Sequence, residues 1–172
     1  MIPMRRRTLL STLLAVGLTL AVAVPAAYSS RGKPKPRGQD GTLSIEDGKG
    51  TVQIAARGSV LGQLDNGRLI VTDTKPYDQK RPTIRGATWH RRRSRTTVEY
   101  GGRDLHYRIA GGFYRIKIVG LGIDLSAVGR GSVTLQGDAR YADTGLYSLN
   151  GAEFVPVPYE RTTLQLGPLA SQ

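Results

Sequence analysis

The sequence contains no cysteine, and only two of its 172 residues are histidine. Without cysteine the chain cannot form a disulfide scaffold, a thiolate metal site or a cysteine nucleophile. The two histidines, His90 and His106, do not form a ligand pair such as His-x-His, and a catalytic zinc site usually needs three protein ligands. We therefore expect neither a metal nor any other cofactor.

Acidic side chains are also scarce, with 13 Asp and Glu against 25 Lys and Arg. Several acids stand beside glycine or asparagine, where a carboxylate commonly caps a turn: Asp40, Asp47, Asp65 and Asp138. The sequence has no Gly-x-Ser-x-Gly motif, and its Gly-x-Gly triplets at 48, 120 and 129 do not open a helix. We therefore predict a non-enzymatic protein. The alternative is an envelope hydrolase acting on glycans, which would need two carboxylates from Asp124, Glu153 and Glu160 to meet.

The first thirty residues have the three-part layout of a bacterial export signal. Three cations, Arg5, Arg6 and Arg7, precede a stretch without charge, and small residues that include Ala26 and Ala27 follow the apolar run. Residues 1–30 are therefore predicted to be a signal peptide or an uncleaved signal anchor. The sequence 6–10 resembles the core of a twin-arginine signal, although Arg5 stands where Ser or Thr is usual. We expect an exported protein, secreted or associated with the cell envelope, with general secretion favoured over twin-arginine export.

Residues 31–41 are predicted to be a basic linker, because proline and glycine interrupt four cations and almost nothing is apolar. An all-β domain is predicted at 42–167, followed by a tail at 168–172. Only an uncleaved leader would bring this protein to a membrane.

The predicted domain shows alternating apolar and polar residues, with turn signals every 8 to 12 residues. Hairpins are expected at Asp65–Arg68, at Gly111–Gly112 and at Asn150–Gly151. The second would pair Ile109 with Tyr114 and place His106, Arg108, Arg115 and Lys117 on the polar face. Ten or more short strands predict an antiparallel β-sandwich, or alternatively a closed barrel, which could carry a lipid inside.

One weak internal echo relates residues 48–54 to residues 129–135, each of which begins with a Gly-x-Gly sequence. Two copies do not establish a repeat, and glycine-rich turns before strands recur by chance. We interpret the echo as coincidence.

The clearest functional feature is a basic segment at 80–95, with no acid between Asp78 and Glu99. Such a segment attracts anions, and arginine favours bidentate contacts with phosphate or carboxylate. The candidate binding residues are Lys80, Arg81, Arg85, Trp89, Arg91, Arg92, Arg93 and Arg95. The expected partner is an anionic wall polymer, a lipid headgroup or another extracellular polyanion, and there is no dedicated nucleic-acid motif. The alternative is a solvated basic loop without a partner, with Trp89 in the core.

Overall fold

The computed structural model describes residues 40–75, 78 and 81–167. The predicted leader, nearly all of the linker, the tail and Lys80 lie outside these residues, as do the targeting residues Arg5, Arg6, Arg7, Ala26 and Ala27. Within the described part all regular structure is β, which confirms the all-β prediction. The strands are β1 (Gly41–Asp73), β2 (Thr83–Arg85), β3 (Trp89–Arg92), β4 (Thr97–Gly137), β5 (Leu146–Leu149), β6 (Val155–Pro156) and β7 (Thr162–Leu166). None of the described segments is a helix that could cross a membrane.

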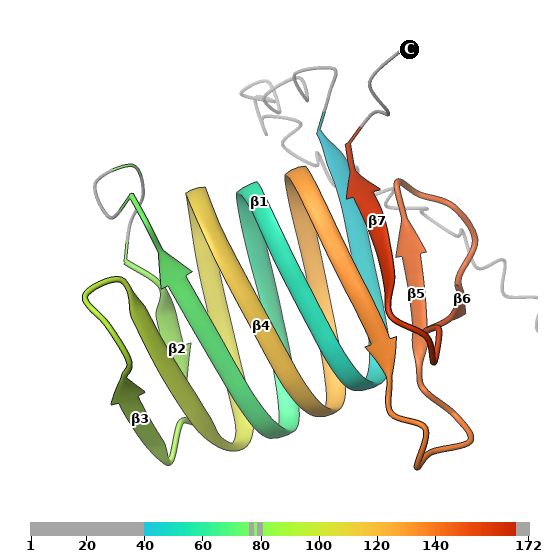
Figure 1. Cartoon of the computed structure of the whole chain (residues 1–172), viewed down its shortest axis with the longest axis horizontal. Helices are drawn as coiled ribbons and strands as arrows, with labels where there is room; N and C mark the ends of the chain where they lie inside the picture. The colour runs from blue at the N-terminus through green and yellow to red at the C-terminus, as the bar shows by residue number, and fades with distance from the viewer. Residues whose placement is uncertain (1–39, 76–77, 79–80, 168–172) are drawn as a thin grey trace, which may run out of the picture. The chain divides into compact units, whose positions relative to one another are not determined.

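Two very long strands build most of the domain. β1 has 33 residues and β4 has 41, whereas a typical strand has about 5 to 6. They pair antiparallel with each other along both of their edges. Gly50 of β1 pairs with Gly120 on one side and with Gly137, which is 17 residues further along β4, on the other. The two strands therefore form a ribbon that winds into a flattened coil with 17 residues of each strand per turn (Figure 1).

Glycine marks the two edges at which the ribbon bends. Neighbouring glycines pair across the strands in two series. One, here called the upper edge, contains Gly41, Gly129 and Gly58, and the other, the lower edge, contains Gly137, Gly50, Gly120, Gly67 and Gly102. At Gly67 φ is +149°, and a Cβ atom would lie 2.2 Å from the carbonyl oxygen of Val119. The bend therefore requires a residue without a side chain at this position.

Between the edges the chain crosses the coil in short passes that form two faces. The front face, toward the viewer in Figure 1, consists in spatial order of β7, 131–135, 51–57, 113–119, 68–73, 97–101 and β3. The back face consists of β6, β5, 42–46, 123–128, 59–66, 103–110 and β2. Neighbouring passes on each face are antiparallel.

The apolar core lies inside the coil because side chains alternate between its interior and its surface. Along β4 from 105 to 118 the buried hydrophobic residues are Leu105, Tyr107, Ile109, Tyr114, Ile116 and Ile118, as the alternation predicts. The predicted polar face is confirmed, because His106, Arg108, Arg115 and Lys117 are all exposed.

The predicted hairpin at Gly111–Gly112 is nevertheless wrong. Ile109 pairs with Val60 and Tyr114 with Ala56, so β4 continues through both glycines and β1 lies beside it. The same error affects Asp65–Arg68, where Gly67 is a bend in β1. A glycine with positive φ suits a tight turn and a bent strand equally, and the partners that decide between them are far away in the sequence.

The turn at Asn150–Gly151 is confirmed. Both residues have positive φ, and the Ala152 amide donates to the Leu149 carbonyl at 3.1 Å. The strands beyond it slip by one residue, because Tyr147 pairs with Val155 and not with Phe154 as predicted.

Several predicted short strands are single passes of β1 and β4. The described part has seven strands in one sheet where ten or more were expected. The sheet is not closed, so the barrel alternative is wrong, and a sandwich of two separate sheets is not confirmed. The echo between 48–54 and 129–135 falls on neighbouring passes of the front face, where Gln53 pairs with Thr134.

Candidate anion-binding surface

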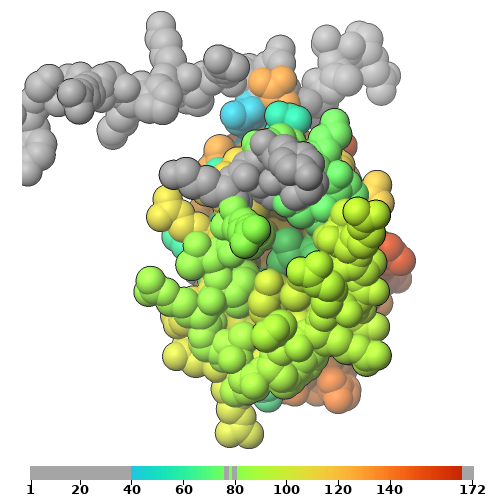
Figure 2. Space-filling view, turned by 90° about the vertical axis from the view of Figure 1, so that its left-hand side faces the viewer, coloured from blue at the N-terminus to red at the C-terminus, as the bar shows by residue number. Residues whose placement is uncertain are grey.

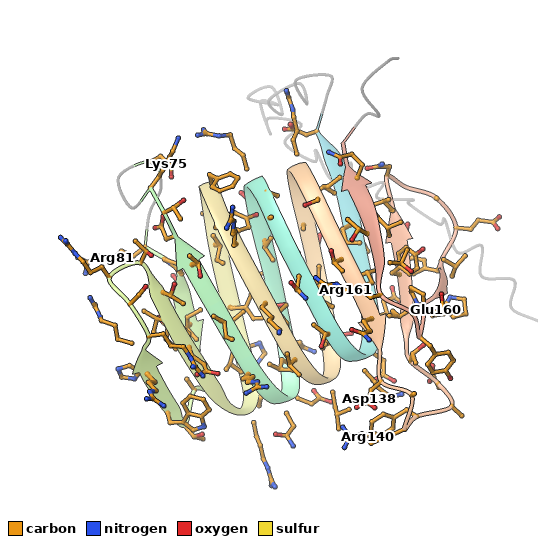
Figure 3. The ribbon with its side chains drawn as sticks, viewed as in Figure 1. Lys75, Arg81, Asp138, Arg140, Glu160 and Arg161 are labelled. Atoms are coloured by element: carbon orange, nitrogen blue, oxygen red, sulfur yellow. The ribbon has the colours of Figure 1, made fainter. Side chains whose placement is uncertain are left out.

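The predicted basic segment forms one end of the coil. β2 pairs with 106–108 of β4 and β3 pairs with 98–101, and neither strand has a second partner among the described residues. Five cations of this segment are exposed and form no ion pair with another described residue: Arg81, Arg85, Arg91, Arg92 and Arg95. We call these five arginines the basic edge. Figure 2 looks onto this end, and Figure 3 labels Arg81.

Arg93 has a structural role. Its Nε donates to Oε2 of Glu99 at 2.7 Å, and Glu99 is only 2% exposed. Arg68 lies on the other side, with its Nη1 3.9 Å from Oε1 of Glu99. A buried carboxylate needs such partners, because an unpaired charge away from water is costly. Arg93 is therefore held in an ion pair that supports the fold, whereas the five arginines of the basic edge form no ion pair with a described residue.

Trp89 lies on the surface and not in the core. It is 47% exposed, and its ring lies over Gly101, where a Cβ atom would be 2.2 Å from Cζ2 of the indole. The next residue, His90, places its ring 6.2 Å from that of Tyr100. One face of the Trp89 indole thus packs on backbone, and the side chain remains accessible beside the basic edge.

Four cations that the predicted site does not include lie on the front face, and one of them, Arg57, is paired with Asp78, its Nη2 lying 3.3 Å from Oδ2. Arg115 and Lys117 project outward from the central pass of β4, and Arg68 projects from β1. Lys117 pairs with Gln53 on one side and with Ile70 on the other. The alternation within β4 already assigned Arg115 and Lys117 to a polar face. Only the pairing of strands far apart in the sequence brings them to the same face as β3.

A shallow hollow of about 270 Å³ occupies the middle of the front face. Its polar lining combines two cations with amide and hydroxyl groups, from Arg115, Lys117, Gln53, Thr72, Ser132 and Thr134. Hydroxyl pairs stiffen this surface, since Thr134 lies 2.9 Å from Thr163 and Thr72 lies 3.0 Å from Thr97, measured between Oγ1 atoms. Such a lining offers hydrogen bonds to hydroxyl groups as well as charge to anions.

The front face has few carboxylates to balance these cations. In its described passes the acids are Glu99, which is buried against Arg93, and Asp73 at the end of β1. The passes of the back face carry more acids: Glu46, Asp65, Asp104 and Asp124. The positive charge of the basic edge therefore continues onto the front face.

The carboxylates considered for catalysis are not joined by any interaction among the described residues. Both oxygens of Asp124 accept hydrogen bonds, from the Asp47 amide at 2.8 Å and from Nε2 of Gln63 at 3.0 Å. Glu153 follows β5 and Glu160 precedes β7, both at the end of the coil away from the basic edge, where Figure 3 labels Glu160. The described residues contain no cluster of three or more His, Asp or Glu suited to a metal ion.

Shifted pKa values occur away from the basic edge. Hydrogen bonds from Arg140 lower the pKa of Asp138 to about 2. The pKa of Asp143 is lowered by the Gly145 backbone amide and by Lys49, whose own pKa is raised chiefly by Asp47. These charges are paired with one another near the lower edge, and none belongs to the candidate surface.

Comparisons of the chain with known proteins give no relative: no family model, curated protein or solved structure matches it.

Proposed function

We propose that the protein is an exported, non-enzymatic β-domain that binds an anionic polymer outside the cytoplasm. The observation that carries the proposal is the basic edge, five exposed arginines without an acidic partner among the described residues. Arginine keeps its charge at any accessible pH and matches the geometry of phosphate, sulfate or carboxylate groups. Arg68, Arg115 and Lys117 extend the same field along the front face.

A polymer suits this surface better than a small anion, because the cations are spread over several antiparallel strands and do not converge on one point. Neighbouring strands are spaced by about 4.8 Å. The front face from β3 to the pass at 113–119 therefore spans three spacings, about 14 Å. A chain with repeated negative groups would contact several of these cations at once. Trp89 is the only tryptophan, so a surface that stacks successive bases, as single-strand binders do, has little support.

The two alternatives have weaker support. A lipid carrier needs an apolar cavity, but the coil interior contains closely packed side chains such as Ile54, Leu69 and Ile118. A glycan hydrolase needs two carboxylates that are free to act, and Asp124 already accepts two hydrogen bonds.

The proposal is tested by salt elution from an immobilised heparin-like polymer. The variant Arg91→Ser, Arg92→Ser, Arg95→Ser should elute at lower salt, and the slope of log affinity against log salt should fall by about 2 to 3. Arg93 is left intact because its replacement would disturb Glu99.

The matched control removes three exposed cations away from the basic edge, Arg130, Arg140 and Arg161, each changed to serine (Figure 3 labels the last two). It has the same net charge as the test variant. Any difference in elution salt between the two variants therefore depends on where the charge was removed. Equal elution of the wild type and the test variant would overturn the proposal.

A further inference from the structure

The two ends of the coil differ in the way their edges meet solvent. At the first end the basic edge places arginines along β2 and β3. Charged edge strands resist pairing with other chains, and this is a common protection of exposed sheet edges. At the other end the last front-face strand is β7, with the sequence Thr-Thr-Leu-Gln-Leu and no charge.

One edge of β7 is available for pairing. Its other edge pairs with residues 131–135 of β4, and no other described strand pairs with it. Its backbone therefore presents a row of amide and carbonyl groups that an added strand would satisfy. Neither proline nor lysine interrupts this row.

Exposed apolar side chains collect near the same end. Among the described residues seven large hydrophobic side chains are exposed, and four of them come from the segment around β5 and β6: Leu146, Phe154, Val155 and Tyr159. Their exposed fractions lie between 39% and 49%. The ends of a repetitive β-structure normally carry a polar cap, because an apolar end favours association. This end lacks such a cap, whereas the end with the basic edge has one.

We propose that this end binds a second copy of the chain, with the two β7 strands pairing antiparallel about a twofold axis. A second copy supplies an uncharged extended strand of matching length. Twofold pairing is also the commonest closed arrangement of identical subunits. The charges near this end do not add up to one sign, since Asp138 is paired with Arg140, Asp143 is paired with Lys49, and the adjacent Glu160 and Arg161 carry opposite charges. The two basic edges would lie at opposite ends of the dimer, away from each other.

Strand direction favours this arrangement over head-to-tail stacking. β7 and β3 are the first and seventh passes of an antiparallel front face, so they run in the same direction. Stacking one coil on the next would pair β7 with β3 in parallel, which is slightly less stable per residue. A twofold axis instead continues the antiparallel order.

The lack of cysteine makes the test direct, because a single introduced cysteine can form a disulfide only with another copy. Full-length Thr162→Cys, Thr163→Cys and Gln165→Cys variants should be oxidised mildly, and at least one should give a covalent dimer. Arg91→Cys, on β3, is the control and should stay monomeric.

Light scattering provides a second test. The average molar mass of the wild type should rise with concentration toward that of a dimer. Thr163→Lys should shift it to the monomer, and Gln136→Lys, on an interior strand, should not.

Three results would overturn the inference. The first is a monomeric wild type at all concentrations with no dimer from the β7 variants. The second is dimer formation by Arg91→Cys to the same extent as by the β7 variants. The third is a disulfide that forms only when Arg91→Cys is mixed with a β7 variant, because that shows head-to-tail stacking. None of these results depends on polymer binding, which the salt elution tests separately.

Discussion

The glycine edges lead to a quantitative prediction for Gly67→Ala. Gly67 lies on the lower edge between Gly102 and Gly120, and a Cβ atom added there would lie 2.2 Å from the carbonyl oxygen of Val119 and 2.7 Å from Cα of Gly120. Non-bonded heavy atoms meet favourably at about 3.5 to 4 Å, so the neighbouring pass would have to move by more than about 1 Å. The positive φ adds about 1 to 3 kcal/mol of backbone strain, and loss of about two ladder hydrogen bonds adds about 1 kcal/mol each. We expect a loss of about 3 to 5 kcal/mol in the free energy of unfolding.

Gly111→Ala is the matched control for this prediction. Gly111 also has positive φ, +79°, but a Cβ atom there would meet nothing within 4 Å. Its cost should be the conformational term alone, about 1 to 2 kcal/mol. Urea unfolding followed by far-ultraviolet circular dichroism measures both variants under the same conditions. If Gly67→Ala is no more destabilising than Gly111→Ala, close contact between passes does not explain the glycine edges.

Two further predictions concern ion pairs. Arg93→Ala should lower the free energy of unfolding by about 1 to 3 kcal/mol, because Glu99 is buried and its remaining partner is 3.9 Å away. Adding Glu99→Gln should recover part of the loss in urea unfolding, and no recovery would show that charge is not the cause. Asp138→Asn should reduce stability at pH 6 but not near pH 2, because the pKa of Asp138 in the folded state is about 2. A depressed carboxylate pKa contributes stability that is present above about pH 4 and is lost as the pH falls toward 2. A pH-independent difference between wild type and variant would contradict this assignment.

The alternation of side chains could be predicted from the sequence, but the pairing of strands could not. Ile116 and Lys117 lie on the expected sides of β4 because a period of two fixes the face whatever the neighbour is. Their partners on β1 lie more than 40 residues away, and no local signal identifies them. Gly111–Gly112 has the composition of a tight turn, yet the strand continues through it. At Asn150–Gly151 a similar pair does form the turn.

The candidate surface could likewise be predicted only in part from the sequence. Composition alone located the basic segment, and the structure describes Arg81, Arg91 and Arg92 as exposed. The role of Arg93 could not be predicted, because nothing in the sequence marks Glu99 as buried. Whether the segment has a partner remains the proposal that salt elution tests.

The 17-residue winding limits how the length of this protein can change. After the first pass, which lies between β4 and β5, each pass of β1 is held between two passes of β4, so an insertion in one strand alone would shift its pairing on both edges. A shift by one residue would also exchange the interior and exterior side chains of every following pass. A viable lengthening therefore needs 17 residues in β1 and 17 in β4 together, which adds one full turn. Sequences that share this architecture should differ in length by such matched pairs, and single insertions should be confined to the segments outside the two long strands.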